Sequence, residues 1–173
     1  MREAVVVAVA RTPIGRAYRG TLADTSPQEL AAHAISHAVA RAGVDPGSVD
    51  DVILGCAMPE GAQGFNVARQ AALRAGLLGS TPCMTVDRQC ASGLMAIATA
   101  AKEIIDDRMD VTIGGGVESI SLVQTPQMRV APDPELLRMH DDIYMPMLQT
   151  AEVVAKRYNI SRDVMDEYAL QSQ

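Results

Sequence analysis

Short apolar runs alternate with helical patterns along the first two thirds of the chain. Four strands are predicted at the apolar runs of residues 5–10, 51–57, 84–87 and 110–113. Helices are predicted between them, over residues 26–42, 66–75 and 90–107. Because strands that alternate with helices pair in parallel, the pattern predicts an α/β fold in which a mostly parallel sheet is flanked by helices.

Capping residues mark the ends of the first two helices. Ser26 is placed to cap the first helix, with Pro27 at its first position and Glu29 closing a capping box. Gly43 is expected to end this helix in the left-handed conformation, and Gly76 to end the second. These signals agree with the helices that the apolar pattern predicts.

The pattern changes at Ser119, where a loop-rich segment is predicted. Four prolines fall in this segment, at positions 126, 132, 134 and 146. Two helices are predicted after it, over residues 147–158 and, capped by Ser161, from residue 162 to the end. We expect residues 1–118 to form a core domain and residues 119–173 the beginning of a loop domain. The last helix reaches Gln173 without a stop signal, which predicts an incomplete chain.

Composition and charge exclude several classes of protein. Hydrophobic residues make up 48% and charged residues 21% of the 173, which is typical of a soluble globular protein. The net charge is −6 and no run of Lys or Arg occurs, so no nucleic-acid partner is expected. The apolar run at residues 4–10 is too short to span a bilayer, so no membrane association is expected. Three cysteines without a close-spaced pair indicate a reducing, cytoplasmic setting.

Cys90 is the candidate nucleophile, because it lies where a strand turns into a predicted helix. The free N–H groups and positive potential of a helix start favour a thiolate. The helix after it is apolar on nearly all sides, which predicts burial, and Gly93 is expected to allow close packing of another backbone. A helix terminus contributes only ~0.3–1 kcal/mol, and at best ~2 kcal/mol. Full activation therefore needs a base.

No base for Cys90 is apparent within the chain. None of the three histidines, His33, His37 and His140, lies in a context that indicates a catalytic partner. His33 and His37 stand one helical turn apart, but no Glu, Asp or Cys is arranged around them, so a packed or surface pair is predicted and no metal site is expected. We therefore expect the base to come from elsewhere.

Other candidate residues have simpler structural interpretations. Cys56 and Cys83 are expected to be structural thiols. The run at residues 114–116, GGG, lacks the Lys and Ser/Thr of a phosphate-binding loop, so it predicts a tight turn at a strand end near the site. Two groups of side chains in the loop-rich segment remain open between pocket lining and filler or solvated positions: Met128, Met139, Met145 and Met147, and the cations Arg129 and Arg138.

Five motifs in order resemble the thiolase family, from Arg11 to Gln173. The first follows the first strand, at residues 10–15, ARTPIG. The nucleophile motif is at residues 87–94, DRQCASGL. The others are QGFNVARQAAL at residues 63–73, GGGVES at 114–119, and TAE at 150–152 leading to YNISR at 158–162.

The resemblance implies a ping-pong acyltransferase with CoA as co-substrate and no tightly bound cofactor. Cys90 would attack the keto carbon of a 3-ketoacyl-CoA, acetyl-CoA would leave, and free CoA would resolve the acyl-enzyme. The backbone N–H of Cys90 would form part of an oxyanion hole. The activating His, a second acid/base Cys and an Asn-held water would lie in a carboxyl-terminal half that this sequence lacks. Met147 matches a Met beside the acyl and pantetheine pocket, and homodimers or homotetramers are expected.

Two positions depart from the family pattern, and other functions remain open. Asp87 stands where the family often has Asn, and Met147 is followed by Leu148 and Gln149 where the family has Met-Gly, which bears on the pocket assignment. The QGFN stretch resembles degradative members and favours thiolysis over condensation of two acetyl-CoA. The alternatives are a β-ketoacyl synthase relative, which uses acyl carrier protein, and a non-catalytic half that acts only in assembly.

Overall fold

A computed structural model describes residues 2–173 of the chain and contains two compact units. The first unit ends at Met128 and the second begins at Arg129. The sheet and the helices around it all belong to the first unit. Each unit is described by itself below.

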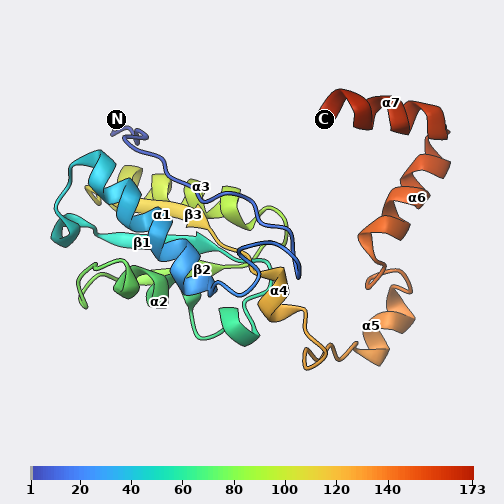
Figure 1. Ribbon diagram of the computed structural model, residues 1–173, viewed down its shortest axis with the longest axis horizontal. Coiled ribbons are helices and arrows are strands. Elements are labelled where there is room, and N and C mark those ends of the chain that lie inside the picture. Colours follow the sequence, from blue (N-terminus) through green and yellow to red (C-terminus); the bar gives the residue numbers. More distant parts are fainter. Residues whose placement is uncertain (1) are drawn as a thin grey trace. The chain divides into compact units, whose positions relative to one another are not determined.

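The first unit is built on a sheet of three parallel strands. Their order is β2 (Cys83–Val86), β1 (Asp51–Gly55), β3 (Thr112–Gly116), with β1 in the centre (Figure 1). Val52 of β1 lies opposite Cys83 of β2 and Ile113 of β3. All carboxyl ends of the strands therefore lie at one edge of the sheet, where parallel α/β proteins place their sites. The predicted α/β fold with a parallel sheet is confirmed.

Helices cover both faces of this sheet. α1 (Pro27–Ala42) and α2 (Val67–Arg74) lie on one face, and α3 (Ser92–Ile105) on the other (Figure 1). Two short 3-10 helices, η1 (Pro46–Ser48) and η2 (Gly61–Gln63), follow α1 and β1. The layer order helix, sheet, helix explains why β1 reads as a continuous apolar run: both of its faces are buried.

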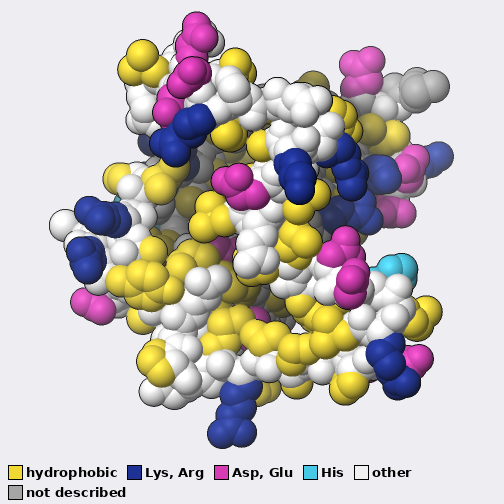
Figure 2. Space-filling model, turned by 90° about the vertical axis from the view of Figure 1, so that its right-hand side faces the viewer, with side chains coloured by type: hydrophobic (Ala, Val, Ile, Leu, Met, Phe, Trp, Pro, Cys, Tyr) yellow, Lys and Arg dark blue, Asp and Glu magenta, His cyan; other side chains and the backbone are white. Residues whose placement is uncertain are grey.

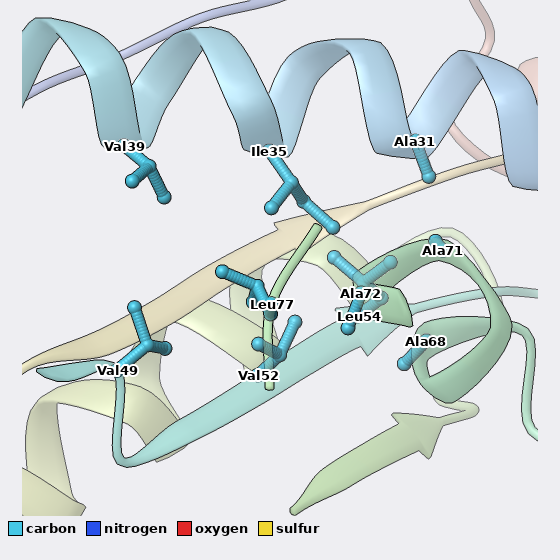
Figure 3. Packing of buried hydrophobic residues seen from close by; sticks show 10 residues of the cluster. All are labelled: Ala31, Ile35, Val39, Val49, Val52, Leu54, Ala68, Ala71, Ala72 and Leu77. Carbon is cyan, nitrogen blue, oxygen red and sulfur yellow. The ribbon is translucent and has the colours of Figure 1, made fainter. Parts of the chain in front are cut away.

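Alternate side chains of β1 enter two separate cores. Val52 and Leu54 pack with Ile35 of α1 and the alanines of α2, as Figure 3 shows. Ile53 points to the opposite face and packs with Ala96 and Ala100 of α3. Burial of each of these branched side chains contributes ~1.5–3 kcal/mol. The small side chains of α2 and α3 let both helices approach the sheet closely.

The predicted caps are mostly present. Ser26 accepts a hydrogen bond from the Glu29 N–H, and Gly43 is left-handed with φ 66°. The capping box is only half formed, because the Glu29 carboxylate pairs with Arg74 instead of turning back to Ser26. Gly76 has φ 90° and follows the second helix as expected.

The strand predicted at residues 5–10 is absent, which corrects the prediction of a buried first strand. Val5, Val6, Val7 and Val9 are 70–80% exposed. An apolar groove of about 510 Å³ is lined by residues 4–10 on one side and by β3, α1 and α3 on others. Near the ends of the segment, Arg2 pairs with Asp110 and Arg41 donates to the Val9 carbonyl. Because the groove separates it from the free edge of β3, its backbone forms no ladder.

The segment predicted as loop contains two short helices, which the apolar pattern did not indicate. α4 (Ile120–Val123) belongs to the first unit, where it contacts η2. α5 (Pro134–Met139) begins the helices of the second unit and is capped by the Asp133 carboxylate, which accepts from the Leu136 N–H. The first unit thus runs past residue 118 to Met128, and the domain division at residue 118 stays a prediction.

The second unit continues with two longer helices, α6 (Met147–Arg157) and α7 (Arg162–Ser172). Ser161 caps α7 by accepting from the Val164 N–H, as predicted. Ala155 is buried in this unit, whereas the other side chains of α6 and α7 are half-buried or exposed.

Many hydrophobic side chains are exposed, and those on the face shown in Figure 2 are interspersed with both signs of charge.

The prediction that α3 is buried on all sides is wrong. Ala96 and Ala100 face the sheet, but Leu94 is 72% and Ile97 49% exposed. Among residues 2–173, no helix has the length and apolar character needed to cross a membrane.

Candidate active site

Cys90 lies on a tight turn between β2 and α3. α3 begins at Ser92, two residues later than predicted, so Cys90 precedes the helix and is not part of it. The backbone here forms a turn instead, in which Gln89 is left-handed with φ 49° and the N–H groups of Ala91 and Ser92 donate to the carbonyls three residues before them, at 3.1 and 3.0 Å. The thiol of Cys90 is exposed. The turn therefore presents the sulfur at the carboxyl edge of the sheet.

Side-chain hydrogen bonds hold this turn. The buried Ser92 hydroxyl accepts from the Arg88 N–H at 2.8 Å and donates to the Gln89 carbonyl at 2.5 Å. The Asp87 carboxylate accepts from the Gln89 N–H at 2.8 Å. These bonds bridge the whole turn and stabilise the left-handed residue before Cys90.

Glycines let the start of α3 approach the strand ends. A Cβ on Gly55, the last residue of β1, would collide with the backbone of Ser92 and Gly93. A Cβ on Gly114 of β3 would lie 2.8 Å from the Ile97 Cα. A Cβ on Gly93 would meet nothing within 4 Å, so the expected role of Gly93 in close packing belongs to Gly55 instead. The GGG run forms the body of β3 and not a tight turn, although Gly116 does lie at the site.

A pocket of about 280 Å³ opens beside Cys90, and three segments form it. They are the end of β1 at Gly55 and Ala57, the turn from Gln89 to Gly93, and the end of β3 from Gly116 to Glu118. Within residues 2–173, the N–H groups of Cys90 and Gly93 donate to no acceptor. Free backbone donors next to a nucleophile can stabilise an oxyanion that forms there.

A polar network forms the wall of this pocket at Glu118. One carboxylate oxygen, Oε2, accepts from the Ala57 N–H at 2.8 Å. The other, Oε1, accepts from Nε2 of Gln63 at 2.5 Å. Gln63 is fully buried; its Nε2 also donates to the Met58 carbonyl at 2.8 Å, and its Oε1 accepts from the Ser119 N–H. The network thus connects the loops that follow β1 and β3.

The other two cysteines are poorly suited to nucleophilic attack. Cys56 is buried, and burial together with the nearby Glu118 carboxylate raises the pKa of its thiol to about 11. Burial also raises the pKa of the Cys83 thiol, which is half-buried in β2 with its sulfur 3.6 Å from the Thr81 carbonyl. Both thiols stay protonated at neutral pH, in agreement with their interpretation as structural residues.

His33 and His37 are not among the residues that line this pocket. His33 and His37 are on the exposed face of α1, with ring centroids 4.4 Å apart. His140 and the exposed Met147 belong to the second unit, where Met147 begins α6. Among residues 2–173 no group of three or more His, Cys, Asp or Glu is arranged for a metal ion.

Sequence reasoning did not assign Gln63, Ala57 or Glu118 to the site. A signal was present, because Glu118 follows β3 and the loop from Ala57 to Gln63 follows β1, and side chains after parallel strands gather at one sheet edge. The hydrogen bonds between the two loops could not be read from spacing. They depend on a side chain, Gln63, that is polar and yet fully buried.

Comparisons with known proteins assign the chain to a family. The family described as thiolase, N-terminal domain, matches residues 4–173. The chain is 44% identical over 172 residues to a 3-ketoacyl-CoA thiolase of Bacillus subtilis, covering 99% of this chain and 44% of that protein. It is 38% identical over 189 residues to an acetyl-CoA acetyltransferase of Cupriavidus necator, covering 100% of this chain and 47% of that protein.

A solved structure is similar along nearly the whole chain. The crystal structure of the Bacillus anthracis acetyl-CoA acetyltransferase matches with a TM-score of 0.81 and 35% identity. The match covers 98% of this chain and 45% of that one. The chain therefore spans less than half the length of the relatives described here.

Proposed function

Because the chain belongs to the thiolase family, we propose that it carries the nucleophile of a CoA-dependent acyltransferase that cleaves 3-ketoacyl-CoA. The observation that carries this proposal is the exposed Cys90 thiol, which shares a pocket with two unpaired backbone N–H groups. A thiolate supplies the nucleophile, and the N–H groups of Cys90 and Gly93 supply donors for the oxyanion. The glycine wall at Gly55 and Gly116 leaves room for a thioester.

In the proposed reaction, the Cys90 thiolate attacks the keto carbon of the substrate. The bond between that carbon and the neighbouring α-carbon then breaks, and its electron pair takes a proton from an acid as acetyl-CoA leaves. The thiol of free CoA attacks the remaining thioester, transfers its proton to a base, and releases a shortened acyl-CoA together with the Cys90 thiolate. No metal or tightly bound cofactor is needed for either step.

The acid and the base are proposed to come from residues beyond this chain. The pocket lining contributed by residues 2–173 contains no histidine, and its carboxylate, Glu118, already accepts two hydrogen bonds. The related proteins are more than twice as long as the matched segment, which leaves room for such residues. We propose that Met147 lines the acyl and pantetheine site in the complete enzyme, and that homodimers or homotetramers form.

Condensation of two acetyl-CoA is the second candidate direction. Relatives named acetyl-CoA acetyltransferase favour it, whereas the relative with 44% identity is named 3-ketoacyl-CoA thiolase and favours thiolysis. Both directions use the same Cys90 thioester. We propose a reducing compartment such as the cytoplasm, since all three cysteines are free.

A chimera tests the proposed activity. Residues 2–173 replace the matching segment of the Bacillus subtilis relative, and the purified protein is incubated with acetoacetyl-CoA and CoA. We expect acetyl-CoA as product, and we expect an acylated Cys90 by mass spectrometry when CoA is omitted. Cys90→Ser should abolish both signals and Cys83→Ser should leave both.

Several outcomes would overturn the proposal. A chimera that is folded by circular dichroism and gel filtration but produces no acetyl-CoA contradicts thiolysis. If acyl carrier protein thioesters acylate Cys90 and CoA thioesters do not, the β-ketoacyl synthase alternative holds. A folded chimera in which Cys90 is never acylated supports a role in assembly only. Should the chimera fail to fold, the same assays apply to residues 1–173 co-expressed with the rest of the relative as a second chain.

A further inference from the structure

One carboxylate, that of Glu118, lines the Cys90 pocket and joins the two loops that meet there. Glu118 uses both oxygens as acceptors, one for the Ala57 N–H and one for Nε2 of Gln63. Ala57 and Glu118 line the pocket, whereas Gln63 lies behind it and is fully buried. The position of the wall relative to Cys90 is therefore coupled to this pair of side chains.

The donors and acceptors in this network can be arranged in only one way. The Gln63 amide oxygen accepts from the Ser119 N–H, and its nitrogen donates to Met58 and Glu118. An amide at position 118 could not accept from both partners, because its nitrogen carries only donors. A buried amide left without a partner destabilises its surroundings, so the network would rearrange.

We propose that Glu118 is a positioning residue for acyl transfer at Cys90, acting through Gln63 and the Ala57 N–H. This inference rests on the proposed acyl transfer and goes further, because it assigns a role to a residue that takes no part in the chemical steps. The carboxylate fixes the loops after β1 and β3, and these loops orient the acyl group for attack by Cys90. An acyl group displaced by about 1 Å reacts on the order of a hundred times more slowly.

The exchange of the two side chains provides the sharpest variants. Glu118→Gln places the new amide nitrogen, a donor, beside Nε2 of Gln63, which is also a donor, so the hydrogen bond between the two side chains is lost. Gln63→Glu places two carboxylates side by side, with no donor between them. The double variant Gln63→Glu/Glu118→Gln restores a donor–acceptor pair between the two positions and keeps the bonds from Ala57 and Ser119, but it loses the donors to the Met58 carbonyl and the Cys56 sulfur. Glu60→Gln is the matched control, since it makes the same change in the loop after β1, to which Glu118 is hydrogen-bonded, and the Glu60 side chain has no hydrogen bond within residues 2–173.

The experiment measures kcat and KM for acetoacetyl-CoA in the chimera described above. We expect Glu118→Gln to lower kcat at least tenfold with KM changed less than threefold, and Glu60→Gln to change neither more than twofold. The double variant should recover at least threefold in kcat over either single variant. A kcat for Glu118→Gln within twofold of the parent overturns the inference, and so does a double variant no better than the worse single variant.

Hydrogen exchange in the 173-residue chain separates this inference from the proposed function. In Glu118→Gln we expect faster exchange at the amides of Ala57 and Ser119, with no change in the amides of α1. If the parent chimera transfers no acyl group, the proposed function fails, and unchanged exchange at Ala57 and Ser119 then also overturns the positioning role of Glu118.

Discussion

Gly55→Ala should displace the Cys90 turn, because Gly55 is where β1 meets the start of α3. The added methyl would lie 2.5 Å from the Ser92 carbonyl oxygen, against 3.4 Å for ordinary contact, and it would meet the backbone atoms of Ser92 and Gly93 at still shorter range. Because all of these are backbone atoms, the overlap cannot be relieved by rotation of a side chain. The start of α3 must therefore retreat by more than about 0.9 Å, the difference between the two distances for the Ser92 oxygen alone.

Overpacking of this kind destabilises by about 1–3 kcal/mol. Gly93→Ala is the matched control, because the methyl of that variant meets nothing within 4 Å and replaces a helical glycine. Alanine stabilises a helix interior by roughly 0.5–1 kcal/mol relative to glycine. The two variants add the same methyl group on opposite sides of one contact. We expect them to shift the free energy of unfolding in opposite directions.

Urea denaturation followed by circular dichroism measures both shifts, and the rate of Cys90 alkylation by iodoacetamide reports the position of the turn. We expect a lower urea midpoint and an altered alkylation rate for Gly55→Ala only. In the chimera, Gly55→Ala should lower acyl transfer on the order of a hundredfold. Two results would contradict this reasoning: a urea midpoint of Gly55→Ala equal to that of the parent, or a loss of stability in Gly93→Ala as large as that in Gly55→Ala. In either case the close contact at Gly55 does not determine the position of the turn.

Three further predictions concern the turn and its surroundings. Ser92→Ala removes two hydrogen bonds from the turn and should lower the free energy of unfolding, measured by urea titration, by about 1–3 kcal/mol. The control Ser36→Ala loses one exposed hydrogen bond to the His33 carbonyl and should change this free energy by less than about 0.5 kcal/mol. Asn66→Ala should destabilise more than Asn66→Gly by about 1 kcal/mol in the same assay, because Asn66 has φ 56° and glycine tolerates that conformation; equal losses would locate the effect in its side-chain bonds alone. The raised pKa of the Cys56 thiol means that the folded state holds this proton more tightly than the unfolded state, so stability present below pH 9 should decline as pH rises towards 11. Cys56→Ala should decline less over that range, by roughly 2 kcal/mol, and parallel curves for the two proteins would contradict the raised pKa.

The parts of the fold that depend on local signals were predictable from the sequence. The caps at Ser26, Gly43 and Ser161 act over a few residues and are present in the structure. The parallel sheet was predictable from short apolar runs that alternate with helical patterns. A strand of such a sheet is buried on both faces, so it has no polar side and forms a continuous apolar run. The strand predicted at residues 5–10 was not found, since an apolar run shows that a segment can form a strand but not which neighbour it pairs with.

The position of the candidate nucleophile was predictable from the sequence, whereas its surroundings were not. Cys90 was identified from a strand, a turn and a family motif, and the structure exposes it in a pocket. The start of α3 was misplaced by two residues because Arg88 to Ser92 form a hydrogen-bonded turn, with a left-handed Gln89, that residue preferences do not indicate. The role expected of Gly93 belongs to Gly55, which lies 38 positions away and meets it only after β1 and α3 have packed.

The conformation of the Cys90 turn depends on the core as well as on the hydrogen bonds within the turn. A left-handed non-glycine residue such as Gln89 costs on the order of 1–3 kcal/mol. The two Ser92 hydrogen bonds and the bond from the Gln89 N–H to Asp87 contribute about 0.5–1.5 kcal/mol each, so the local bonds offset this cost. What remains is the packing of α3 on β1, where Ile53 and Ala96 are fully buried and Gly55 admits the helix start. The nucleophile is therefore held by the same contacts that stabilise the sheet, and a change in that packing should alter reactivity at Cys90 before it unfolds the chain.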